Sequence, residues 1–192
     1  MNHTANPDRP SLQERFVAAT QSRDLTLPID GGTRTDADIL LAAGYASAGN
    51  TRATLALDFY RLKATGDLAD FRRLSDLTGR WLCGRSMRSG RRKMKMIEAR
   101  DLATRVLFWW RAPACQPCEG RGHPLMPNSP VVNPGHDCPV CHGTGQYPIH
   151  RIVPPGTADE ARWLVDEMDS LCAIVFNDMA RLLVRQMPSL EL

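Results

Sequence analysis

The chain has 192 residues, of which 43% are hydrophobic and 23% are charged, with a formal net charge of +3 at pH 7. This length predicts one or two small domains that can bury a core. No apolar run approaches the roughly 20 residues that cross a bilayer, and no apolar signal segment follows Met1, so a membrane span is excluded and we expect an intracellular, soluble protein.

Helical signals follow a polar N-terminal segment. Residues 1–35 contain three prolines and a Gly-Gly pair, which predicts a flexible arm with a short helix near residues 12–19. Residues 36–111 have helical periodicity, which predicts a helical region. The predicted helices span residues 36–48, 51–64, 67–82 and about 91–111, with a glycine-containing break at residues 84–90.

Positive charge is concentrated in residues 67–111, which carry twelve basic and five acidic side chains, a balance of +7. Residues 157–192 carry three basic and seven acidic side chains, a balance of −4. A basic stretch attracts polyphosphates because neutralised phosphates release their counterions. A solvated basic face is the alternative that charge alone leaves open. Residues 36–111 are therefore the expected helical, DNA-binding region. The candidate DNA contacts are Arg80, Arg85, Arg88, Arg91, Arg92, Lys93 and Lys95.

The helices predicted at residues 67–82 and from Arg91 onward have the outline of a helix-turn-helix. In that motif the second helix enters the major groove of DNA. The break between these two helices is longer than the usual turn. Since the outline occurs in many unrelated helical proteins, it indicates DNA binding only in combination with the charge.

An eight-residue phrase with the pattern Cys-x-x-Cys-x-Gly-x-Gly occurs at residues 115–122 and again at residues 138–145. Nineteen residues lie between the inner cysteines. Four thiolates complete a tetrahedron around zinc and leave no open position for chemistry, and glycine supplies the positive φ and close main-chain approach that such turns need. The spacing therefore predicts one structural zinc ion, Zn2+, bound by Cys115, Cys118, Cys138 and Cys141.

Other roles for these residue types are possible. Two disulfides would fit a secreted protein, and a thioredoxin-like site would have one Cys-x-x-Cys beside a strand and a helix. His123, His136 and His142 lie near enough to replace a cysteine as ligand, but four sulfurs suffice, so we expect loop or supporting roles. Cys83 and Cys172 are expected to be buried, inert thiols.

Residues 112–150 form the expected zinc-binding motif, and residues 151–192 the C-terminal helix that packs on the helical body. Thr157 and Glu160 have the spacing of a capping box, and apolar residues recur at helical spacing from Leu164 onward. The fold class predicted is mostly α: a helical bundle with a helix-turn-helix-like basic region and an inserted four-cysteine zinc-binding motif.

The order of these segments resembles the late-gene antiterminators called Q in lambda-like phages. The likeness covers roughly residues 36–187 and includes AGYASAGNTRATLALDFY, SDLTGRWLCG, and the basic stretch before LATRVLFWWRAPACQPC. The family's four zinc-binding cysteines correspond one for one to the four named above. Its basic segment corresponds only loosely to residues 80–95, so no individual base contact is transferred.

The resemblance implies a phage- or prophage-encoded protein in the cytoplasm of the bacterial host. Such a protein binds double-stranded DNA at a late promoter and engages paused RNA polymerase holoenzyme, including its sigma factor; a host elongation factor can also take part. The polymerase then becomes resistant to pausing and termination. No catalytic step is implied, and the sequence contains no nucleophile–base pair or phosphate loop, so we expect a protein that is not an enzyme.

Three other functions remain open at the level of sequence. A zinc-containing DNA-binding repressor would share every local feature. A J-protein-like chaperone module would have four copies of the cysteine phrase and a His-Pro-Asp tripeptide, whereas this chain has two copies and no such tripeptide. A thiol oxidoreductase would need a free dithiol, which bound zinc would remove.

Overall fold

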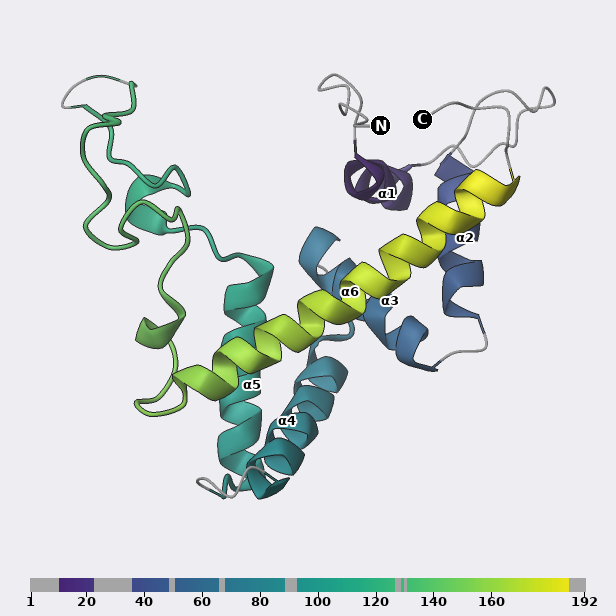
Figure 1. Ribbon diagram of the computed structural model, residues 1–192, viewed down its shortest axis with the longest axis horizontal. Helices are drawn as coiled ribbons and strands as arrows, with labels where there is room; N and C mark the ends of the chain where they lie inside the picture. Colours follow the sequence, from purple (N-terminus) through teal and green to yellow (C-terminus); the bar gives the residue numbers. More distant parts are fainter. Residues whose placement is uncertain are drawn as a thin grey trace, which may run out of the picture. The chain divides into compact units, whose positions relative to one another are not determined.

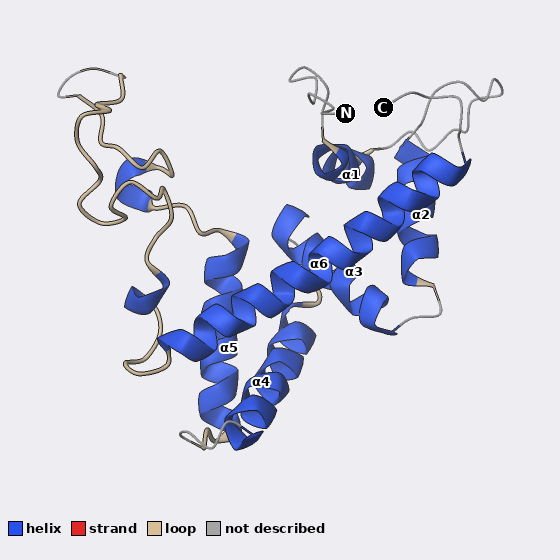
Figure 2. Ribbon diagram, viewed as in Figure 1, coloured by secondary structure: helices blue, strands red, loops and turns tan. Residues whose placement is uncertain are grey.

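The computed structural model describes residues 11–22, 36–48, 51–65, 68–88, 93–126, 129 and 131–186 (Figure 1). Within these residues the chain forms helices and loops and no strand (Figure 2), which confirms the mostly α prediction. None of the described helices is long and apolar enough to cross a membrane. The elements in chain order are α1 (Leu12–Gln21), α2 (Asp36–Ser47), α3 (Thr51–Thr65), α4 (Phe71–Arg88), α5 (Met96–Arg111), η1 (Gln116–Cys118), η2 (Ile149–Arg151) and α6 (Ala158–Gln186).

Contacts within the chain define two units. Unit 1 consists of residues 1–67 and 168–192, and unit 2 consists of residues 68–167. Helix α6 therefore contributes its first part to unit 2 and its second part to unit 1. The boundary after residue 67 falls inside the region that the sequence suggested as one helical segment.

Unit 1 is built from α1, α2, α3 and the second part of α6. Helix α1 begins with a capping box, in which Ser11 and Glu14 each bind the other's backbone N–H. Its Phe16 is buried and packs edge-on against Tyr60, which in turn packs against Phe176 of α6. The short helix predicted near residues 12–19 is confirmed, but it is packed into unit 1 and is not part of a free arm. The rest of the expected arm lies outside the described residues.

In unit 2, α4 and α5 pack along their length as an antiparallel hairpin (Figure 1). The hydroxyls of Ser75 and Thr104 lie 2.6 Å apart and link the two helices. Gly79 lets the helices approach closely, because a Cβ at this position would lie 2.9 Å from Cγ and 3.2 Å from Cα of Arg100. Small residues thus set the close spacing of the hairpin.

The structure corrects the predicted helix limits around the basic run. Helix α4 continues through Gly84 to Arg88, where a break was predicted, and α5 begins at Met96 and not at Arg91. A glycine inside a helix costs about 1 kcal/mol relative to alanine. Burial of Leu82 and Ser86 on either side of Gly84 offsets that cost. The resulting pair is a helical hairpin, and the structure does not show a helix-turn-helix.

Helix α6 begins where the sequence predicted, immediately after Thr157. The Thr157 hydroxyl donates to the carbonyl oxygen of Pro154 at 2.7 Å and so orders the turn before the helix. In unit 2, Ala161 and Leu164 of α6 are fully buried. The start of α6 is therefore part of the core of unit 2.

Candidate metal centre

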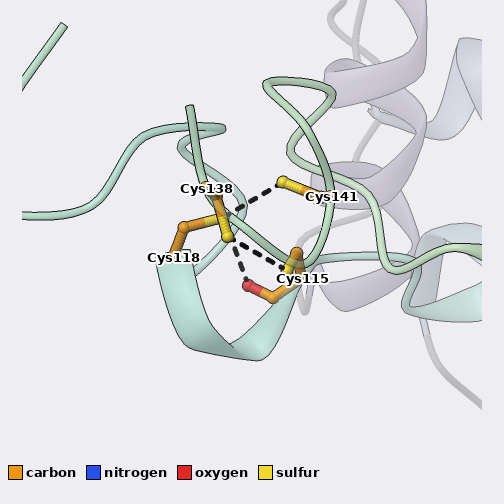
Figure 3. Close-up of side chains that lie close together, drawn as sticks. All are labelled: Cys115, Cys118, Cys138 and Cys141. Carbon is orange, nitrogen blue, oxygen red and sulfur yellow. Dashed lines mark hydrogen bonds between the residues drawn. The ribbon is translucent and has the colours of Figure 1, made fainter. Parts of the chain in front are cut away.

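The four predicted cysteines lie together in a buried cluster (Figure 3). Their sulfur atoms are all within 4.8 Å of one another, and each cysteine has at most 2% of its surface exposed. The sulfurs of Cys118 and Cys141 are 3.7 Å apart, and those of Cys115 and Cys138 are 4.0 Å apart. In a tetrahedral site with metal–sulfur bonds of about 2.3 Å, sulfurs lie about 3.8 Å apart. The cluster can therefore hold a metal ion.

In this geometry the cysteines form no disulfide and the nearby histidines lie outside the cluster. All six cysteines are free, and the sulfur separations far exceed the roughly 2 Å of a disulfide. None of the three nearby histidines belongs to the cluster in the described part of the chain. His123 Nδ1 instead lies 3.1 Å from the carbonyl oxygen of His136, and His142 is exposed.

The two cysteines outside the cluster differ from each other. Cys172 is buried in unit 1, as predicted, and burial raises its pKa to about 12, which keeps it a protonated thiol at neutral pH. Cys83 on α4 is only partly buried, which corrects the prediction for that residue. Its Sγ donates to the carbonyl oxygen of Met94 at 3.4 Å.

The two copies of the cysteine phrase hold each other through reciprocal backbone hydrogen bonds. The N–H of Cys115, the first residue of one phrase, donates to the carbonyl of Gly145, the last residue of the other, at 2.8 Å. The N–H of Cys138 donates to the carbonyl of Gly122, also at 2.8 Å. The two copies therefore make equivalent hydrogen bonds to each other, and they form a pseudosymmetric pair of turns around the cluster.

Positive φ angles recur at matching positions of the two phrases. Glu119 and His142 both have φ of 50°, in the left-handed region that non-glycine residues rarely adopt. A Cβ at Gly122 would collide with the carbonyl oxygen of Gly143, and a Cβ at Gly145 would collide with that of Gly120. Glycine is therefore required at these positions for both φ and space.

Burial and backbone donors set the electrostatics of the cluster. Backbone N–H groups of Cys141 and Val140 lower the pKa of Cys138 to about 7, because they stabilise its thiolate. Burial raises the pKa of Cys115 to about 12. A bound cation would offset the desolvation and mutual repulsion of thiolates in this buried space. The donor set thus matches a thiolate-bound cation.

Residues 112–150, which we call the cysteine loop, are joined to the end of α5 by several contacts. Trp109 Nε1–H donates to the carbonyl of Tyr147 at 2.6 Å, and the Tyr147 N–H donates to the carbonyl of Pro113 at 2.7 Å. An antiparallel bridge pairs Ala114 with Gln146, and Tyr147 also packs against the cluster. No sequence pattern singled out Tyr147, because its role depends on contacts with residues more than thirty positions away.

The structure describes five of the seven candidate DNA contacts. Arg85 is partly buried, and its guanidinium carbon lies 4.4 Å from the ring centre of Trp163. Arg91 and Arg92 lie outside the described residues. The other four are exposed on α4 or just before α5: Arg80, Arg88, Lys93 and Lys95.

Fold and site together define a mostly helical protein with a buried four-cysteine cluster that can hold a metal ion. No family model, curated protein or solved structure matches the chain. Evidence for the function therefore comes from the residues themselves and from the resemblance in their order.

Proposed function

We propose that the four-cysteine cluster binds one structural zinc ion. Zinc is favoured by an all-thiolate tetrahedral donor set, and four protein ligands leave no position for a substrate. Structural zinc contributes on the order of 10 kcal/mol to folding at neutral pH. Among the described residues of the range 112–150, the buried hydrophobic cluster consists of the four cysteines themselves, and Val140 and Tyr147 pack against them. Metal binding would therefore supply much of the stability of this loop.

We further propose that the protein is a phage transcription antitermination factor. It binds DNA at a late promoter, engages paused RNA polymerase and makes it resistant to pausing and termination. The observation that carries this proposal is the order of the segments: a basic helical region, two Cys-x-x-Cys-x-Gly-x-Gly phrases and an amphipathic helix, as in the lambda Q-like antiterminators. The charge balance of +7 over residues 67–111 supports the DNA-binding part.

We assign the proposed contacts with polymerase to the parts of the chain that lie outside the basic segment. Residues 157–192 have a balance of −4, and the cysteine loop exposes Leu125, Met126 and Val131. Acidic and apolar surfaces suit a protein partner better than DNA. Sigma factor and a host elongation factor belong to the same proposal as further partners.

In-vitro transcription tests the proposed function directly. The template carries a candidate late promoter followed by a terminator, and a matched template lacks the promoter-proximal element. We expect the protein to increase the full-length product on the first template only. Loss of initiation without added read-through would instead identify a DNA-binding repressor, and no effect on either template would refute both functions.

A further inference from the structure

The acidic side chains of the α4–α5 hairpin are already engaged within the hairpin. Three of them form ion pairs with arginines, and the fourth, Glu98, accepts the backbone N–H of Lys95 at 3.1 Å. The arginines in these pairs are thereby partly neutralised and are poor candidates for phosphate contacts. The ion pairs are Asp70–Arg73, Asp76–Arg100 and Asp101–Arg105.

Five exposed cations of residues 68–111 have no acidic partner within the described part of the chain. They are Arg72, Arg80, Arg88, Lys93 and Lys95. Arg88 is the last residue of α4, and Lys93 and Lys95 lie in the connection just before α5. We call these three residues the hairpin end. The unneutralised charge of the hairpin is therefore concentrated at this connection and not along α5.

The backbone that carries the hairpin end is held in place. Met94 is buried between the two exposed lysines, and its N–H donates to the hydroxyl of Ser86 at 3.1 Å. Ser86 is itself only 3% exposed and donates to the carbonyl of Cys83 at 2.8 Å. Because the lysines are attached to an anchored segment, less backbone freedom is lost when they bind a charged ligand.

We propose that the hairpin end contacts the phosphate backbone of double-stranded DNA, and that α5 does not act as a recognition helix. This inference rests on the proposed DNA binding and specifies its surface and mode. The exposed arginines of α5, Arg100 and Arg105, are both ion-paired, and Arg85 is stacked on Trp163. Lysine and arginine contacts to phosphate position a protein on DNA without reading its sequence.

An anionic membrane is the competing ligand for the same charges. Met87 and Ile97 next to the hairpin end are 63% and 77% exposed, and basic residues beside apolar ones also occur on membrane-surface helices. Such helices, however, present a complete apolar face, whereas Lys93 and Lys95 flank a methionine that is buried.

Two charge-matched double variants of the full chain test the inference. Lys93→Gln with Lys95→Gln removes two cations of the hairpin end, and Arg73→Gln with Arg105→Gln removes two ion-paired cations of the same hairpin. Affinity for a labelled duplex is measured by anisotropy between about 50 and 200 mM salt, a range over which phosphate contacts change affinity strongly. The slope of log K against log[salt] is negative, and each lost phosphate contact reduces its magnitude by about 1. We expect the magnitude of this slope to decrease by about 2 for the lysine variant and to stay unchanged for the arginine variant.

The outcomes separate this inference from the proposed function. An unchanged slope for the lysine variant, or a loss confined to the arginine variant, would overturn the inference and leave DNA binding intact. Binding of the wild-type chain to phosphatidylserine vesicles but not to the duplex at the lowest salt concentration would overturn both. The expected slopes combined with no transcriptional read-through would support the hairpin end as a DNA surface and refute antitermination.

Discussion

Replacing Cys138 with serine is expected to abolish stoichiometric zinc binding and to unfold the cysteine loop. The substitution removes one of four ligands and leaves three buried thiols around an incomplete site. Much of the free energy that zinc contributes to folding, on the order of 10 kcal/mol, would then be lost. Zinc content measured by mass spectrometry and thermal unfolding followed by circular dichroism would report the two effects together.

Cys83→Ser is the matched control for this prediction. It makes the same chemical change on α4, outside the cluster, and a serine hydroxyl can replace the thiol as a donor to the Met94 carbonyl. We expect normal zinc content and a small change in melting temperature. Wild-type zinc content and stability in the Cys138 variant would contradict the assignment of this residue as a ligand.

Replacing Gly145 with alanine is expected to destabilise the loop by about 3 kcal/mol, the sum of backbone strain and a steric collision. Its φ of +72° costs an alanine about 1–2 kcal/mol, and the new Cβ would also collide with the carbonyl oxygen of Gly120. Displacing Gly120 would disturb the other cysteine phrase, where the Gly120 N–H donates to the carbonyl of Cys115 at 3.0 Å. A melting temperature lowered by about 10 °C, together with weaker zinc retention against a chelator, would confirm this effect.

Substitutions at two other glycines distinguish the cost of backbone strain from the cost of a steric collision. Gly156 has φ of +78° and no neighbouring atom within 4 Å of the position that a Cβ would take, so Gly156→Ala should cost only the strain, roughly 1 kcal/mol. Gly135 has no positive φ and its nearest neighbour, Asn133 Oδ1, is 3.5 Å away, so Gly135→Ala should change stability by less than about 0.5 kcal/mol. Equal losses for the Gly145 and Gly156 variants would show that the close approach to Gly120 is unimportant.

The residues of the cysteine cluster could be predicted from the sequence because the signal is local. Two ligands within one turn, repeated once, leave few geometries other than a shared site. The arrangement of the backbone around the sulfurs could not be predicted. The left-handed conformation falls on Glu119 and His142, which carry no glycine signal, and Tyr147 is placed by hydrogen bonds to distant parts of the chain.

Helix interiors were predictable from periodicity, but the limits around the basic run were not. Gly84 suggested a break because glycine weakens helices, yet α4 continues through it, with buried residues on both sides. The contact between Arg85 and Trp163 could not be predicted either, because Trp163 lies 78 positions later in the sequence. Charge counting identified the basic segment, whereas only the ion pairs show which of its cations remain available.

Metal analysis of the purified chain combined with X-ray absorption tests the central claim most directly. We predict one zinc ion per chain, bound by four sulfur atoms at about 2.3 Å. A chain that is properly folded without metal, or an ion bound mainly by nitrogen or oxygen, would contradict the account.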